Sequence, residues 1–268
     1  MDQQLENILI KASPIAVELA KKAGKVQLEN LGKIKSIEYK GAINLVTEVD
    51  KKCEELIVAG LQEHFPDHDI LGEEGIGQRQ KSDFRWIVDP LDGTTNYAHE
   101  FPFFGVSIAL EYQEDLVLGV IYDPNRDELF LGVKDKGATL NGEPIRVAKA
   151  KNLQESLLAT GFAYNVQEYG YPDNLDNFAK FIKVALAVRR PGAAAIDLAY
   201  VACGRLDGFW ELYLKPWDIA AGIIIIREAG GMVTSFDGSE FKLYGTEILV
   251  SNGLIHKQMI EVLKSDRS

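Results

Sequence analysis

The chain has 268 residues, of which 46% are hydrophobic and 26% are charged. This balance is typical of a folded globular protein, and it excludes an intrinsically disordered chain. The formal net charge of −11 argues against a nucleic-acid-binding surface, because phosphate contacts along a nucleic acid need clustered Lys and Arg.

The sequence also limits the expected compartment. Residues 1–6 contain neither a basic region nor an apolar core of the signal type, and the most apolar stretch, 219–226, is too short to span a bilayer. Cys53 and Cys203 form neither a disulfide framework nor a zinc-binding pattern, so we expect both to be buried, reduced thiols. We therefore expect a soluble, cytoplasmic protein without a membrane contact.

Amphipathic helices are expected near the start of the chain. Residues 3–10 predict a short helix, and residues 13–32 predict a longer one, joined to the first by a kink at Pro14. A further helix is expected over residues 44–65. It would carry Asp50 in its first or second turn, where an acid can simply compensate the helix dipole.

The segment 84–96 contains the most informative sequence. Its first five residues are mostly apolar, with β-branched Ile87 and Val88, and they predict a buried strand, which Pro90 is expected to end. Asp89 and Asp92 follow the strand, and Gly93 allows a sharp turn into a capped helix. Free N–H groups at a helix start attract an anion and the acids attract a hard cation, so this segment predicts hydrolysis of a phosphate ester beside divalent metals.

Taken alone, this pattern has an ordinary explanation, because Asp-Pro and Asp-Gly pairs are common in solvated turns. Two other places strengthen the metal interpretation. A strand over residues 70–72 leads to Glu73 and Glu74, of which only one can face a shared site, since adjacent side chains on an extended segment point opposite ways. Asp218 lies at the start of a helix so apolar that it must be buried, and a carboxylate there needs either a cation or a capping role.

The remaining elements change character near residue 150. Residues 103–147 predict short strands in an antiparallel meander, with a hairpin turn at Asn141-Gly142. Beyond it, strands are expected at 156–160, 206–212, 232–236 and 247–250, and helices at 174–184, 193–201, 216–229 and the C-terminus. We expect one α+β domain over 1–268, with subdomains of roughly 1–150 and 151–268.

Two long motifs carry a family resemblance: WIVDPLDGTTN at 86–96, and KPWDIAAG at 215–222 continued by EAGG at 228–231. Shorter matches are LVTEVD at 45–50, GEE at 72–74 and RPGAAA at 190–195. On these residues the chain resembles the inositol monophosphatases, a family of magnesium-dependent, lithium-sensitive phosphatases. The resemblance covers essentially the whole chain. It implies a layered αβαβα sandwich, with an antiparallel sheet in the N-terminal half and a mixed sheet in the C-terminal half.

The resemblance implies two to three Mg²⁺ ions, for which Mn²⁺ is a possible substitute. Glu73, Asp89 and the carbonyl group of Leu91 would hold the first ion. Asp89 would bridge to a second ion, which Asp92 and Asp218 also hold. A third, weaker ion would lie near Glu73.

The resemblance also implies catalytic roles for Glu73, Thr94 and Asp50. Thr94, hydrogen-bonded to Asp50, would orient the attacking water, and Glu73 would help to take its proton. The N–H groups of Gly93 and Thr94 would hold the phosphate. The implied substrate contacts are Leu91, Asp92, Gly93, Thr94, Arg189, Gly192, Ala193, Ala194, Glu211 and Asp218. Lys40, in a polar loop, is a further candidate.

The expected function is hydrolysis of inositol monophosphate, of the myo-inositol 1-phosphate class. Thr95-Asn96 and the run at 204–208 before Glu211 favour this branch of the superfamily over bisphosphate nucleotidases and histidinol phosphatases. Fructose-1,6-bisphosphatase activity, alone or as a second activity, is the main alternative. A role as a protein partner of the transcription apparatus is another, which the acidic composition permits but does not indicate.

The expected partners are a small phosphorylated polyol as substrate and a second copy of the chain in a homodimer. Arg189 and Arg190 are candidates for reinforcing phosphate binding or for a subunit contact. Surface salt bridges explain the two arginines equally well.

Overall fold

The computed structural model describes residues 3–33, 37–40, 44–77, 81–163 and 173–265. Its helices are α1 (Gln3–Asn30), α2 (Glu48–His64), α3 (Thr94–Ala98), α4 (Leu175–Ile182), α5 (Ala194–Ala202), α6 (Pro216–Glu228) and α7 (His256–Lys264), with a 3-10 turn, η1 (Leu153–Glu155).

The longer sheet has seven strands in the order β3-β4-β5-β6-β7-β8-β9. They are β3 (Asp69–Gly72), β4 (Phe84–Asp92), β5 (Gly105–Tyr112), β6 (Asp115–Asp123), β7 (Glu128–Val133), β8 (Gly137–Leu140) and β9 (Glu143–Pro144). All neighbours are antiparallel except β3 and β4, which are parallel. The predicted meander is therefore confirmed, with one parallel strand added at its edge.

The shorter sheet has five strands in the order β11-β10-β12-β14-β13. They are β10 (Leu157–Thr160), β11 (Ala187–Arg189), β12 (Gly208–Leu212), β13 (Met232–Thr234) and β14 (Glu247–Ser251). The sheet is parallel across β11, β10 and β12 and antiparallel beyond, so it is mixed, as predicted. A separate antiparallel pair is formed by β1 (Ile37–Lys40) and β2 (Asn44–Thr47).

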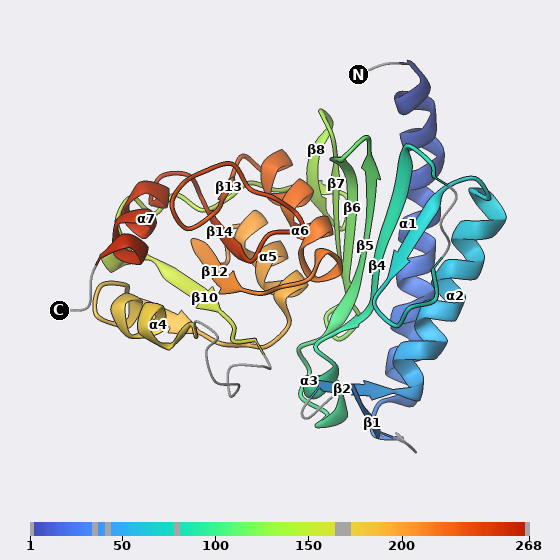
Figure 1. Ribbon diagram of the computed structural model, residues 1–268, viewed down its shortest axis with the longest axis horizontal. Coiled ribbons are helices and arrows are strands. Elements are labelled where there is room, and N and C mark those ends of the chain that lie inside the picture. The colour runs from blue at the N-terminus through green and yellow to red at the C-terminus, as the bar shows by residue number, and fades with distance from the viewer. Residues whose placement is uncertain (1–2, 34–36, 41–43, 78–80, 164–172, 266–268) are drawn as a thin grey trace.

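These elements stack in five layers (Figure 1). Helices α1 and α2 cover the outer face of the seven-stranded sheet, α5 and α6 lie between the two sheets, and α4 and α7 cover the far face of the five-stranded sheet. The expected layered αβαβα sandwich is confirmed.

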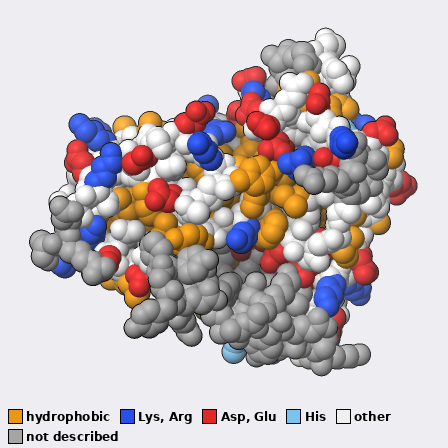
Figure 2. Space-filling view, viewed as in Figure 1, with side chains coloured by type: hydrophobic (Ala, Val, Ile, Leu, Met, Phe, Trp, Pro, Cys, Tyr) orange, Lys and Arg blue, Asp and Glu red, His pale blue; other side chains and the backbone are white. Residues whose placement is uncertain are grey.

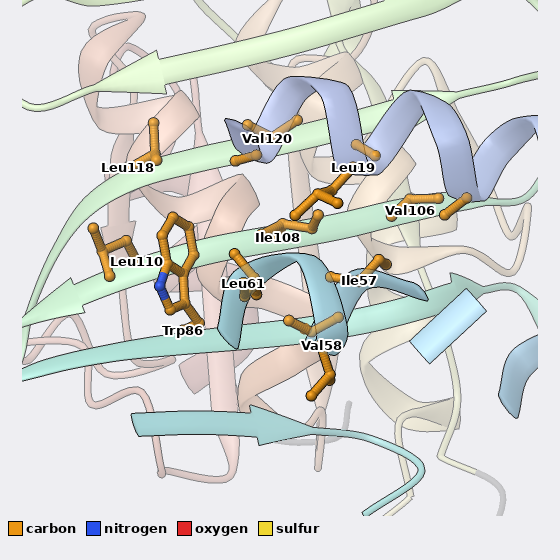
Figure 3. Packing of buried hydrophobic residues seen from close by; sticks show 14 of the residues in the cluster. Leu19, Ile57, Val58, Leu61, Trp86, Val106, Ile108, Leu110, Leu118 and Val120 are labelled. Carbon is orange, nitrogen blue, oxygen red and sulfur yellow. The ribbon is translucent and has the colours of Figure 1, made fainter. Parts of the chain in front are cut away.

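The outer layer is held by apolar burial. Leu19 of α1 and Ile57 and Leu61 of α2 pack against Trp86 of β4 and Ile108 of β5 (Figure 3). Burying each such side chain stabilises the fold by about 1.5–3 kcal/mol. This packing holds β4 and α2 in place, and these two elements carry Asp89 and Asp50.

The middle layer depends on α6, which is apolar nearly all round because both sheets contact it. Its residues Ile219, Ile223 and Ile225 are buried. They pack with Ile121 of the longer sheet and Val250 of the shorter one. Residues 219–226 of α6 are buried, so only its two ends lie near a surface, with Asp218 at the N-terminal end.

The first helix differs from the prediction, because α1 is continuous through Pro14 rather than broken into two helices. Leu5 and Leu9 lie on the same buried face as the residues after the proline. A proline inside a helix costs about 3 kcal/mol. Burial of the two leucines offsets that cost at about 1.5–3 kcal/mol each.

The prediction that Pro90 ends its strand is also wrong, since β4 runs on to Asp92. Asp89 pairs with Ser107 and Asp92 pairs with Gly105, so β4 holds one residue more than β5 over this interval. This bulge accommodates the proline, which has no N–H to donate to a neighbouring strand.

Smaller differences occur elsewhere. Residues 44–47 form β2 rather than a helical turn, and α2 begins at Glu48 after an N-cap at Thr47. Strand β11 was not expected, whereas the Asn141-Gly142 hairpin turn is confirmed by positive φ angles of 50° and 86°. Cys53 is buried but Cys203 is only half-buried, and both are free thiols.

The surface carries many of the charged residues that make up 26% of the chain. Figure 2 shows acidic and basic side chains interspersed on the face in view, with hydrophobic side chains gathered towards its middle. Among the described helices, none is both long and apolar enough to cross a membrane.

Candidate active site

A cavity of about 350 Å³ lies between the two halves of the chain. Two walls face it. We call Glu73 and residues 89–94 the sheet wall, and residues 190–197 and 211–218 the helix wall. Eleven predicted site residues line the cavity: Glu73, Asp89, Leu91, Asp92, Gly93, Thr94, Gly192, Ala193, Ala194, Glu211 and Asp218.

The bulge in β4 shapes the sheet wall. The N–H of Leu91 donates to Oδ1 of Asp89 at 2.9 Å, which fixes the first carboxylate within the bulge. The buried side chain of Gln27 in α1 donates through Nε2 to the carbonyl oxygen of Pro90 at 2.8 Å. Oδ2 of Asp92 accepts from the N–H of Ala195, at the start of α5, at 2.7 Å. The bulge is thus tied both to the outer helices and to the helix wall.

Thr94 is held by a carboxylate from behind. Its Oγ1 lies 2.9 Å from Oδ1 of Asp50, and Oδ2 of Asp50 accepts the N–H of Thr47 at 2.9 Å. Asp50 therefore caps α2 and binds Thr94 at the same time, so the capping explanation and the site explanation are compatible. Asp50 is buried and is not among the cavity-lining residues. Gly93 has a φ of 90°, which glycine adopts readily where the chain turns into α3.

Glu73 lines the cavity, whereas Glu74 is not among the lining residues. The loop that carries them is organised by Glu54 of α2, whose Oε1 accepts from the N–H of Ile76 at 3.2 Å. Burial and the charge of Glu74 raise the pKa of Glu54 to about 7. The sequence analysis missed Glu54, although its signal was visible: it lies on the same face of α2 as Ile57 and Leu61 and is fully buried.

The helix wall brings together three carboxyl groups from three elements. Glu211 projects from β12, Asp218 from the first turn of α6 and Asp197 from the beginning of α5. Oδ2 of Asp218 accepts from the N–H of Lys215 at 2.7 Å. Asp218 therefore both caps α6 and faces the cavity. The sequence analysis did not single out Asp197.

The acids of the cavity strongly affect one another. Burial, followed by the charges of Glu73, Asp92 and Asp218, raises the pKa of Asp89 well above its ordinary value. Burial raises the pKa of Asp92 to about 7, and burial together with the charge of Asp92 raises that of Asp218 to about 7. Four mutually repelling carboxyl groups in a buried site require positive charge to be ionised together.

This donor set fits a hard cation, because it consists of carboxylate oxygens with a backbone carbonyl group nearby. As they stand, no three Asp, Glu, His or Cys side chains of the described residues are close enough together to hold a metal ion. Like charges at such a site repel one another, and a bound cation would draw these groups together. The number and type of the acids, rather than their present spacing, indicate a metal site.

Some predicted site residues lie elsewhere. Arg189 is exposed, its Nη1 donates to the carbonyl oxygen of Val188 at 3.2 Å, and it does not line the cavity. Arg190 lines it instead. Because β11 is a strand that ends at Arg189, consecutive side chains there point to opposite sides. Lys40 is the last residue of β1, and its side chain lies outside the described part of the chain.

The helix wall also has an apolar part that the sequence analysis did not identify. It consists of Leu212, Leu214 and Trp217, and Phe162 lies on the same cavity. These side chains come from the end of β12, the start of α6 and the segments after β10 and β12, so their placement in space, and no local pattern, assigns them to the site.

A family model described as "Inositol monophosphatase family" matches residues 10–267 of the chain. The chain belongs to the inositol monophosphatase family. This is a family of phosphatases, and it is generally metal-dependent.

Individual relatives agree with the family match. The chain is similar to Inositol-1-monophosphatase of Synechocystis, with 46% identity over 252 residues, covering 93% of this chain and 87% of that protein. It is similar to Nus factor SuhB of Pseudomonas aeruginosa, with 41% identity, covering 93% and 94% respectively. The solved structure of inositol monophosphatase from Anabaena has a TM-score of 0.87 and 43% identity, covering 95% and 96%.

Proposed function

We propose that this protein is a magnesium-dependent phosphomonoesterase that hydrolyses inositol monophosphate, of the myo-inositol 1-phosphate class, to inositol and phosphate. One observation carries the proposal: four carboxyl groups, together with Thr94, which Asp50 holds from behind, face one cavity that also carries groups suited to a polyol. The similarity to proteins named inositol monophosphatases supports the choice of substrate.

Glu73, Asp89, Asp92, Asp218 and the carbonyl group of Leu91 would hold two to three Mg²⁺ ions, for which Mn²⁺ is a possible substitute. Bound magnesium supplies positive charge that neutralises the phosphate and favours ionisation of water.

The other residues of the sheet wall bind phosphate and position water. The N–H groups of Gly93 and Thr94 donate to phosphate oxygens. The hydroxyl group of Thr94, fixed by Asp50, orients the attacking water, and Glu73 accepts its proton.

On the helix wall, the carboxylate of Glu211 accepts hydrogen bonds from the hydroxyl groups of the substrate. Backbone groups of Gly192, Ala193 and Ala194 lie beside it on the same cavity. This wall holds the leaving group while the sheet wall acts on the phosphate.

A phosphate-release assay tests the substrate. The panel is myo-inositol 1-phosphate, fructose 1,6-bisphosphate, histidinol phosphate and adenosine 3′,5′-bisphosphate, each at saturating magnesium. We expect the highest kcat/KM with myo-inositol 1-phosphate. A higher kcat/KM with fructose 1,6-bisphosphate would assign the chain to the main alternative, and a preference for either of the other two esters would contradict the inositol assignment.

A second candidate function, contact with the transcription apparatus, is favoured by the similarity to a protein named Nus factor SuhB. Binding of the purified protein to purified RNA polymerase, measured by co-elution in size-exclusion chromatography, tests it. We further propose a homodimer, for which light scattering should give twice the chain mass of 29.7 kDa.

A further inference from the structure

Asp197 has no role in the proposed reaction, yet its position is unusual. It lies near the start of α5, is only 2% exposed and lines the cavity. Its Oδ1 is buried and has no hydrogen-bond partner among the described residues. An unpaired buried carboxyl oxygen destabilises a fold, so a ligand that pairs with it would explain why the group is there.

The surroundings of Asp197 indicate which kind of ligand fits. The carboxyl group of Glu211 lies directly against Gly161, at a place where any side chain on residue 161 would collide with it. Nη1 of Arg190 lies 3.0 Å from where a Cβ on Gly192 would be. Both Asp197 and Glu211 line the same cavity as Arg190. One cation and two acids thus line the helix wall of this cavity.

Electrostatics agrees with this proximity. Burial raises the pKa of Asp197, the charge of Glu211 is the next largest cause, and the positive charge of Arg190 opposes both. Arg190 likewise opposes the raised pKa of Glu211. Because Arg190 already supplies positive charge here, the missing partner of Asp197 need only be a neutral hydrogen-bond donor, such as a hydroxyl group.

We propose that Asp197 and Glu211 together form a two-carboxyl subsite that accepts hydrogen bonds from two hydroxyl groups of the leaving polyol. This inference rests on the proposed phosphatase function and deepens it. It makes Asp197 a specificity-determining residue, and it describes the substrate as a phosphate ester whose leaving group carries at least two hydroxyl groups within reach of both acids.

The test compares esters with and without such hydroxyl groups. Wild type, Asp197→Ala and Asp197→Asn are assayed with myo-inositol 1-phosphate, fructose 1,6-bisphosphate and cyclohexyl phosphate, the last having a six-membered ring with no hydroxyl group. For the hydroxylated ester that wild type hydrolyses best, Asp197→Ala should lower kcat/KM about 10- to 100-fold, mainly through KM. Asp197→Asn keeps one acceptor oxygen and should recover part of this loss.

Turnover of cyclohexyl phosphate should stay within about twofold of wild type in both variants, which also shows that they fold. Asp207→Ala is the matched control. Asp207 is a buried acid of the same half that does not line the cavity, and its Oδ2 accepts from the N–H of Leu157 at 2.8 Å. This control should not change the ratio of kcat/KM between the hydroxylated ester and cyclohexyl phosphate.

Several results would overturn the subsite. They are an equal loss on cyclohexyl phosphate, no loss on any ester, a wild type that hydrolyses cyclohexyl phosphate as well as the best hydroxylated ester, or a raised magnesium requirement with unchanged selectivity. A different result is expected if the subsite exists but inositol monophosphate is not the preferred substrate. In that case wild type prefers fructose 1,6-bisphosphate, and the effect of Asp197→Ala on that ester still decides whether the subsite exists.

Discussion

The two walls of the cavity differ in how they are built and in what they can bind. The sheet wall comes almost entirely from one stretch of chain, residues 89–94, and helices α1 and α2 fix it from behind through hydrogen bonds to Pro90 and Thr94. The helix wall gathers groups from three successive elements, α5, β12 and α6, between residues 190 and 218. One wall is a local motif, whereas the other exists only after folding.

The difference extends to charge. The sheet wall offers acids that repel one another, which suits cations and a phosphate. The helix wall places Arg190 beside Asp197 and Glu211, which suits neutral hydroxyl groups. We therefore expect changes in the sheet wall, and in the proposed metal ligand Asp218, to affect hydrolysis of every ester. Changes in Asp197 and Glu211 of the helix wall should affect the choice among esters.

The largest effect is expected at Asp89, the acid proposed to bridge two ions. Asp89→Asn should lower phosphate release with every ester by at least about 10⁴-fold. This exceeds the loss expected for a general acid or base, because both ions lose a shared ligand. Glu74→Gln is the control, because Glu74 is the neighbour of the proposed ligand Glu73 but does not line the cavity. This variant should retain most activity. Similar losses in both variants, measured as kcat/KM at saturating magnesium, would contradict the ligand assignment.

Thr94 tests the positioning of water within the same wall. Thr94→Ala keeps the N–H group and removes the hydroxyl group, so kcat should fall about 10²–10⁴-fold while KM changes little. Thr94→Ser restores a hydroxyl group that can reach Asp50, and it should recover much of the rate. If Thr94→Ala instead raised KM at unchanged kcat, the hydroxyl group would be a binding group.

Glu211 tests the opposite wall. Glu211→Gln should lower kcat/KM for myo-inositol 1-phosphate about 10- to 100-fold, because a charge-assisted hydrogen bond is replaced by a weaker one. Hydrolysis of p-nitrophenyl phosphate, which has no polyol, should be largely spared. A uniform loss on both esters would mean that Glu211 has a structural role, and the contrast between the walls would then fail.

Glu54 should give the smallest effect, because it acts on the sheet wall only through the loop that carries Glu73. Glu54→Ala removes the acceptor for the N–H of Ile76 and should raise the magnesium concentration for half-maximal activity about 10-fold. Glu55→Ala, an exposed neighbour on α2, is the control. An unchanged magnesium requirement in Glu54→Ala would show that the loop holds its shape without this contact.

The contrast between the walls also explains what could be predicted from the sequence. Asp89, Asp92 and Thr94 were found because one short segment combines a strand, a turn and a helix start. Asp197 was missed because its importance comes from burial beside Glu211, which no local pattern shows. Arg190 lines the cavity and Arg189 does not, and this difference depends on strand β11, which no sequence pattern indicates.

The fold shows the same limit. The helices and strands followed from periodicity, and the layered arrangement followed from the family resemblance. The two proline predictions failed for tertiary reasons. Leu5 and Leu9, before the proline of α1, are buried on the same face as the residues after it, and pairing with β5 continues β4 past Pro90 as a bulge. In each case contacts between distant residues outweigh a local preference.

Adding magnesium back to protein treated with EDTA shows whether the acids of the sheet wall make a cation-dependent phosphatase site. We expect wild type to release no phosphate from myo-inositol 1-phosphate until Mg²⁺ is added, and Mg²⁺ to raise the Tm of wild type but not that of Asp89→Asn. Phosphate release that persists without divalent cations, or an equal rise of Tm in both proteins, would contradict this expectation.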